Sequence, residues 1–146
     1  MTKTTPEDVV KKIREHGATG RQAWQRGDLK EAEEEFLHAW NSLPEPRTGY
    51  DHGQSLSRGL VTFYRDTRQF EKAKGWLDVT REAYESTSDP SVEFLAGTVH
   101  YEAGELDEAF RIFDGLYQQF GQRPFQGVKR DYLDFYKRKV QEGKPK

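Results

Sequence analysis

The feature that most constrains the fold of this chain is a pair of residues, one small and one large, that recurs with a spacing of four. The pairs are Ala32 with Phe36, Ala73 with Leu77, and Ala109 with Phe113. On a helix, positions four apart lie on the same face, one turn from each other. The alanine lets a second helix approach closely, and the large residue fills the space beyond that contact. The sequence therefore predicts three pairs of packed helices rather than strands.

Each small-and-large pair lies in the second of two predicted helices, which a short polar turn separates from the first. The turns are centred on Gly27-Asp28, Thr67-Arg68 and Gly104-Glu105. A glycine just past a helix end adopts the left-handed conformation at little cost, and Asp28 and Asp107 are acids at the start of the next helix. Gly20 and Gly97, in the first helices, carry no side chain that would hold two helices apart.

Aligned on the three alanines, the segments resemble the tetratricopeptide repeat (TPR) family, whose pattern is W-x2-L-G-x2-Y, then A-x3-F, then P. The first segment supplies Gly20, Ala32, Phe36 and Pro44, with His16 and Ala23 at the aromatic positions. The second supplies Leu60, Tyr64, Ala73 and Leu77, and the third supplies Gly97, Ala109 and Phe113, with His100 at the tyrosine position. None keeps the tryptophan. The resemblance implies an all-α fold: an α-α superhelix (solenoid) of three TPR-like helix pairs plus a C-terminal capping helix.

The resemblance and the spacing of apolar residues divide the chain into predicted elements. A single domain covers 1–146, with repeats at 5–46, 54–87 and 90–123, a capping helix at 128–141 and a frayed tail at 142–146. The stretch 44–54, PEPRTGYDHGQ, is rich in proline and glycine and is predicted to be a loop. Thr5 is predicted to cap the first helix, with Pro6 in its first turn.

Composition and motifs argue against an enzyme and against a membrane protein. The chain holds no cysteine, which excludes disulfides, thiolate metal sites and cysteine nucleophiles. It contains no GxSxG, SxxK, GxGxxG or GxxxxGK[ST] motif. Its first residues lack the apolar region of a signal peptide, and no apolar run reaches the length needed to cross a bilayer. We expect a cytoplasmic protein with no catalytic site, no cofactor and no metal.

The four histidines are interpreted as structural residues rather than as metal ligands or catalytic groups. No HExxH pattern occurs, and no two histidines lie four apart. His16 and His100 fall at aromatic positions of the repeat and are predicted to pack in the core. His38 is predicted to face outward on a second helix, and His52 lies in the long loop.

The sharpest functional hint concerns the first helix of each repeat, because the resemblance implies that these helices line a concave binding face. The candidate partner-binding residues are Arg14, Arg21, Trp24, Gln25, Arg58, Thr62, Arg65, Phe94, Thr98 and Tyr101, with Gly17 and Ser55 on the same face. Arginine pairs with carboxylates through two hydrogen bonds, and aromatic rings supply rigid contact area. The sequence therefore predicts a non-catalytic scaffold (adaptor, chaperone-like or inhibitor-type) that binds an acidic protein or peptide segment. The alternative is that these arginines pair with neighbouring acids on the surface.

Two further functions remain as alternatives. Net charge is +3 over 1–30, −9 over 31–127 and +4 over 128–146, which suits partner steering more than nucleic-acid binding. The segment 122–139 nevertheless interleaves aromatic and basic residues, so a nucleic-acid-associated module based on the C-terminal helix is the first alternative. The second is a self-associating structural protein, a homodimer for example, which exposure of Trp40, Phe125 and Phe135 would favour.

Overall fold

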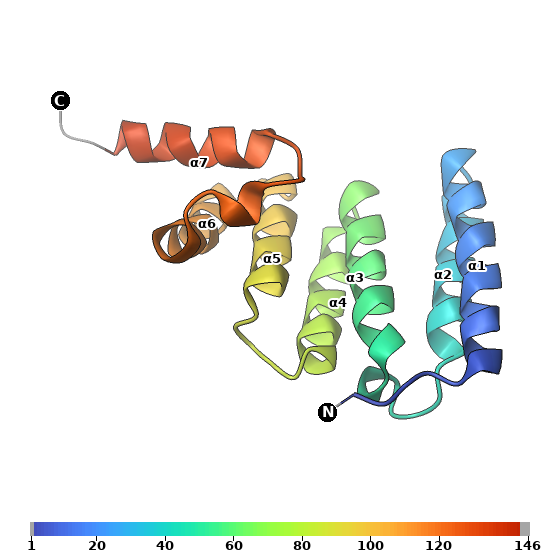
Figure 1. Ribbon diagram of the computed structural model, residues 1–146. Helices are drawn as coiled ribbons and strands as arrows, with labels where there is room; N and C mark the ends of the chain where they lie inside the picture. The colour runs from blue at the N-terminus through green and yellow to red at the C-terminus, as the bar shows by residue number, and fades with distance from the viewer. Residues whose placement is uncertain (1, 144–146) are drawn as a thin grey trace. The chain divides into compact units, whose positions relative to one another are not determined.

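The regular secondary structure of this protein is helical throughout the part of the chain that is described. The computed structural model describes residues 2–143, and within them it contains seven α-helices, two short 3-10 helices and no strand (Figure 1). The α-helices are α1 (Glu7–Gln25), α2 (Leu29–Asn41), α3 (Asp51–Asp66), α4 (Phe70–Ala83), α5 (Pro90–Glu102), α6 (Leu106–Phe120) and α7 (Asp131–Glu142). The all-α class predicted from the sequence is therefore confirmed. None of the described helices combines the length and the apolar character that a membrane-spanning helix needs.

The helices form two compact units. The first, Met1–Thr87, contains the packed pairs α1–α2 and α3–α4, and the second, Ser88–Lys146, contains the pair α5–α6 followed by α7. The boundary falls between the second and third predicted repeats. The three helix pairs are those that the small-and-large pattern predicts, whereas a single domain over 1–146 stays a prediction.

Close approach within the pairs depends on the glycines and alanines that the sequence singles out. Ala32, Ala73 and Ala109 are completely buried. A Cβ atom at Gly20 would lie 2.6 Å from Cε1 of Phe36, and one at Gly97 would lie 2.5 Å from Cε1 of Phe113. Since no real Cβ comes so near a neighbouring atom, each ring occupies the space that its glycine leaves empty. The predicted role of both glycines is confirmed.

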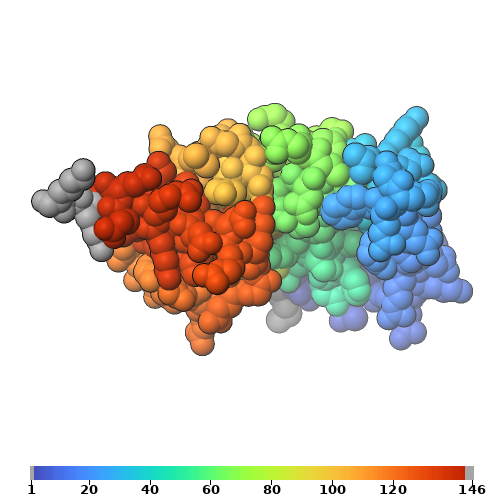
Figure 2. Space-filling view, turned by 90° about the horizontal axis from the view of Figure 1, so that it is seen from above, coloured from blue at the N-terminus to red at the C-terminus, as the bar shows by residue number. Residues whose placement is uncertain are grey.

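Aromatic contacts join the two helix pairs of the first unit. Phe63 of α3 lies edge-to-face against Trp24 of α1 at 5.1 Å and against Phe36 of α2 at 5.3 Å, measured between ring centroids. Trp40 of α2 meets Trp76 of α4 at 5.1 Å. The first pair, blue to cyan, and the green second pair stand side by side in both views (Figures 1 and 2). Trp40 is thus buried in this core, and it provides no exposed surface for self-association.

The second unit has a core made largely of aromatic rings. Phe125, in the 3-10 helix η2 (Arg123–Phe125), lies 5.1 Å from Phe94 of α5 and 5.3 Å from Phe113 of α6. Phe135 of α7 lies 5.1 Å from Tyr101 of α5. Phe125 and Phe135 are therefore buried, so neither supplies the exposed ring that self-association or base stacking would use.

The turns inside the three pairs share one backbone conformation. Gly27, Arg68 and Gly104 have positive φ angles of 84°, 62° and 81°. Asp28 caps α2, because its carboxylate accepts a hydrogen bond from the backbone N–H of Glu31 at 3.1 Å. In the second pair Arg68 adopts the positive φ that glycine adopts in the other two turns.

One predicted helix cap and two predicted helix starts differ from the structure. α1 begins at Glu7 as expected, but Thr5 does not cap it; the Thr5 side chain contacts Asp51 instead, because the N-terminal segment runs beside the start of α3. α3 begins at Asp51 rather than at 54, since the 3-10 helix η1 (Arg47–Gly49) shortens the loop. α7 begins at Asp131 rather than at 128, and it includes Glu142; residues 144–146 of the predicted tail lie outside the described part of the chain.

Candidate functional site

A groove in the first unit is the most promising binding site. Its volume is about 400 Å³, and it lies between α1 and α3, with α2 forming its base. Its lining residues are Gly17, Arg21 and Trp24 of α1, Phe36 and Ala39 of α2, and Ser55, Leu56, Gly59, Leu60 and Thr62 of α3. Arg21, Trp24 and Thr62 are candidate residues from the sequence, and Gly17 and Ser55 belong to the same predicted face.

The base of the groove is apolar and held in place by ring contacts. Trp24 is half-buried and lies edge-to-face against Phe36 at 6.2 Å and against Phe63 at 5.1 Å. Such contacts restrict the indole to one orientation, so that little conformational entropy is lost when a ligand packs against it. The groove therefore offers a preformed apolar surface.

Arg21 places a positive charge at the edge of this apolar surface. Its side chain is exposed, and within residues 2–143 it has neither an ion-pair nor a hydrogen-bond partner. One guanidinium nitrogen lies 3.2 Å from the point that a Cβ at Gly17 would occupy, so the glycine makes room for the arginine along the helix. Arg14, also exposed, lies seven residues before Arg21 and hence on the same side of α1.

The remaining candidates in the first unit do not line the groove. The Arg65 guanidinium forms an ion pair with Asp66 at 2.9 Å, which matches the alternative that arginines pair with neighbouring acids. Arg58 lies over the ring of Tyr84, 5.9 Å from its centroid. Gln25 is exposed at the end of α1 and does not line the groove.

The third predicted repeat belongs to the second unit, and its candidates do not line the groove. Phe94 is buried among Phe113 and Phe125, so it is a core residue and the prediction that it faces a partner is not supported. The Tyr101 ring packs against the aromatic residues of α7. The Thr98 hydroxyl donates a hydrogen bond to the Leu95 carbonyl at 2.6 Å.

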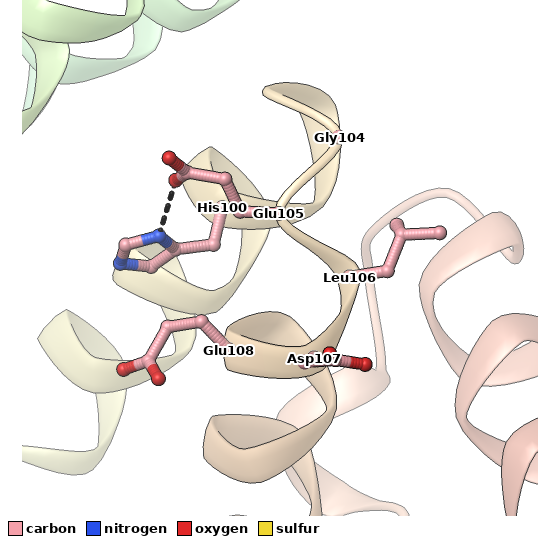
Figure 3. Close-up of a pocket in the computed structure, with 6 residues that line it drawn as sticks. All are labelled: His100, Gly104, Glu105, Leu106, Asp107 and Glu108. Atoms are coloured by element: carbon pink, nitrogen blue, oxygen red, sulfur yellow. Dashed lines mark hydrogen bonds and ion pairs between the residues drawn. The ribbon is translucent and has the colours of Figure 1, made fainter.

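A second hollow, of about 520 Å³, lies at the turn between α5 and α6 and is rich in acids (Figure 3). His100 shares a hydrogen bond of 2.7 Å with Glu105, between Nδ1 and Oε1. The side chain of His100 is 22% exposed, so the prediction of a core position is wrong; the ring reaches the acidic turn instead. Hydrogen bonds from Arg111 hold the pKa of Glu108 below its usual value, so this carboxylate is not suited to act as a general acid at neutral pH.

His16 is likewise not a core residue. Its Nδ1 lies 2.7 Å from Oε2 of Glu35, and its side chain is 34% exposed. The ring lies at the edge of the α1–α2 interface, where solvent and a carboxylate are both within reach. His38 is exposed on α2, as the sequence predicts.

Sequence reasoning missed part of the α3 wall of the groove. Leu56 and Gly59 line it, although neither is among the candidate partner-binding residues. A pattern was available: Leu56, Gly59 and the predicted Thr62 are separated by three residues each, so they share one side of α3. A glycine on that side leaves space, and a partly buried leucine beside it supplies apolar surface.

Comparisons with protein-family models, with curated proteins and with solved structures gave no match to this chain. The geometry and the charge of the groove are therefore the basis from which a function is inferred.

Proposed function

We propose that this chain is a non-catalytic protein-interaction module of the TPR type, which binds a short acidic segment of a partner protein in the groove between α1 and α3. The observation that supports the proposal most directly is the position of Arg21. It is an arginine without a partner among the described residues, and it lies beside the aromatic base of a preformed groove. The helix pairs and their buried glycine and alanine contacts support the assignment to the TPR type.

The two halves of the site recognise different parts of such a segment. Trp24 and Leu56 present apolar surface, which favours an aliphatic or aromatic side chain. The Arg21 guanidinium offers several N–H donors in one plane, and a carboxylate accepts two of them at once. The groove volume of about 400 Å³ falls within the range of roughly 300–1,000 Å³ that is common for binding pockets. A segment with an acid a few residues from a large apolar residue fits both halves.

Long-range charge favours the same partner. Arg14 lies on the same side of α1 as Arg21, and both are exposed. Two positive charges close together raise the association rate of an acidic segment, and added salt weakens this effect.

The proposal is tested by selecting peptides from a random library on the immobilised protein and measuring the affinity of the enriched sequences by fluorescence anisotropy. We expect enrichment of peptides that combine an acid with a large apolar residue. A charge-assisted hydrogen bond contributes about 1.5–3 kcal/mol, so Arg21→Glu should weaken binding of these peptides at least about tenfold.

The matched control is Arg138→Glu. Arg138 is an exposed arginine of the second unit, on α7, and its reversal changes the net charge equally. Peptides that bind Arg21→Glu as tightly as the unchanged protein would refute the groove as the binding site. Equal weakening by Arg21→Glu and Arg138→Glu would show that net charge alone is responsible.

A further inference from the structure

We propose that His16, Glu35 and His38 form a binding site for Zn²⁺ across the α1–α2 pair of the first unit. Each of the three side chains offers one ligand atom, and these atoms all lie within 4.8 Å of one another. Among residues 2–143 this is the only group of three histidines or carboxylates that meets that condition. The inference is independent of the proposed partner binding.

The site is built from two helices. His16 projects from α1, and Glu35 and His38 lie one turn apart on α2, on the same side of that helix. Nδ1 of His16 lies 2.7 Å from Oε2 of Glu35, and the two imidazole rings lie 5.3 Å apart at an interplanar angle of 69°. The tight packing of α1 on α2 at Gly20 holds these three positions near one another.

The distances suit a small ion after modest side-chain rotation. Zinc binds imidazole nitrogen and carboxylate oxygen at roughly 2.0–2.2 Å, so two ligand atoms on a tetrahedral ion lie roughly 3.4 Å apart. The 2.7 Å separation of His16 and Glu35 must widen, and any separation near the 4.8 Å limit must shorten. Torsions of the exposed His38 side chain and of the partly exposed His16 accommodate both changes without moving the backbone.

The donor set selects the class of metal. Two imidazoles and one carboxylate suit Zn²⁺ and its neighbours in the transition series, whereas Mg²⁺ and Ca²⁺ prefer oxygen ligands throughout. The chain has no cysteine, so no thiolate competes for the ion. Partial exposure gives the ion a path to the site and leaves a coordination position for water.

His38 is the residue that distinguishes this site from an ordinary histidine–carboxylate pair. Its ring nitrogens have no hydrogen-bond partner within residues 2–143, although the ring lies against that of His16. The second unit supplies a comparison, since His100 and Glu105 form a pair with the same 2.7 Å separation. Among the described residues, no third histidine or carboxylate joins that pair at the distances found for His16, Glu35 and His38.

The experiment uses the full chain without a polyhistidine tag. Zn²⁺ is titrated by calorimetry, Co²⁺ is titrated while its visible d–d absorption is followed, and the histidine ring ¹⁵N signals are recorded with Zn²⁺. We expect one ion per chain, a Co²⁺ spectrum of low coordination number, and shifts of the His16 and His38 signals but not of those of His52 and His100. Bound Zn²⁺ should also raise the unfolding temperature, because it links α1 to α2.

His38→Ala is the decisive variant, because removal of an exposed ring leaves the fold unchanged. It should weaken Zn²⁺ binding at least about tenfold while the unfolding temperature without metal stays the same. His100→Ala is the matched control and should leave Zn²⁺ affinity unchanged. Zn²⁺ binding that is equally tight in His38→Ala, or titration signals that show no Zn²⁺ binding to the unchanged chain, would overturn the proposal.

Discussion

Phe36 occupies the space next to Gly20, with its Cε1 atom 2.6 Å from where a Cβ at that glycine would lie. The two residues belong to facing helices, α1 and α2, and the same relation holds between Gly97 and Phe113 in the second unit. In these two pairs the distance between the helices is therefore set by the absence of one side chain.

Gly20→Ala should destabilise the protein. Overpacking costs roughly 1–3 kcal/mol, whereas alanine in place of a helical glycine gains only about 1 kcal/mol. Gly115→Ala in α6 is the control, since nothing lies within 4 Å of its added Cβ, and it should stabilise by about 0.5–1 kcal/mol. Chemical denaturation measures both changes. The same sign for the two variants would contradict the close contact, and Phe36→Leu added to Gly20→Ala should restore part of the loss.

Phe125 should be one of the most sensitive residues of the second unit. It is 5% exposed and contacts Phe94 and Phe113, so Phe125→Ala should cost about 3–5 kcal/mol. Phe120, 36% exposed at the end of α6, is the matched control, and its replacement by alanine should cost about 0.5 kcal/mol or less. Thermal unfolding compares the two, and similar losses would show that Phe125 does not belong to the core.

Arg68→Gly should stabilise the turn between α3 and α4. A side chain at the observed φ of 62° costs roughly 1–2 kcal/mol relative to the right-handed region. Part of the gain is lost with the guanidinium contact over Phe70, which is worth about 0.5–1 kcal/mol. Gly27→Ala makes the opposite change in the equivalent turn and should destabilise. Equilibrium unfolding checks both signs, and destabilisation by Arg68→Gly would mean that the Arg68 side chain contributes more than its backbone strain costs.

Acid should weaken the attachment of the N-terminal segment to α3. Hydrogen bonds from the Thr5 side chain, and then from His52, hold the pKa of Asp51 well below its usual range. Because the pKa is lower in the folded chain, the ionised Asp51 carboxylate stabilises the fold at pH values above the usual carboxyl pKa. This stabilisation is lost as the pH falls towards the lowered value. The difference in unfolding temperature between the unchanged chain and Asp51→Asn should therefore shrink from about pH 5 to about pH 3. A difference that stays constant would contradict a stabilising charge at Asp51. The difference between the unchanged chain and Thr5→Val should shrink in the same direction but by less, because His52 and the Thr5 backbone N–H still donate to the carboxylate.

Alkali should weaken the packing of α7. Burial raises the pKa of Tyr136 to about 12, and its hydrogen bond of 2.7 Å to Asp114 acts in the same direction. Because the unfolded chain loses this proton near pH 10, stability should fall as the pH rises from about 10 to about 12. Tyr136→Phe should remove part of that dependence. Unfolding by urea at several pH values measures it in both chains, and an unaltered dependence in Tyr136→Phe would contradict the prediction.

The helix pairs could be predicted because the interactions that form them are local. Gly20 and Phe36 are sixteen residues apart, joined by one turn, and the periodicity of two adjacent helices shows which side chains face each other. Thr5 shows the limit of such reasoning. Its sequence context is that of a helix cap, but Asp51 lies 46 residues later and competes for the same hydroxyl. Only the packed structure brings that competitor into reach.

The groove could be predicted only in part for a related reason. Arg21 and Trp24 follow from the side of α1 that the repeat pattern presents, whereas Phe94, on the same predicted face of the third repeat, is buried by Phe125. The burial of Phe94 depends on the path of the chain after α6, which no repeat pattern describes. The cluster of His16 with His38 likewise depends on the rotation of α1 relative to α2, and a helical period alone does not give this rotation.

The bond between Thr5 and Asp51 has a consequence for the groove, which lies at some distance from it. Thr5 lies two residues before the start of α1 and Asp51 begins α3, and these helices are the two walls of the groove. The two walls are thus joined by hydrogen bonds at their N-terminal ends, while Trp24 and Thr62 lie towards the opposite ends. Beside Trp24 the walls meet through the ring contact with Phe63, so widening the groove for a bulkier partner has to separate these two rings as well. Loss of the hydrogen bonds between Thr5 and Asp51 would therefore change which partners fit, although neither residue lines the groove.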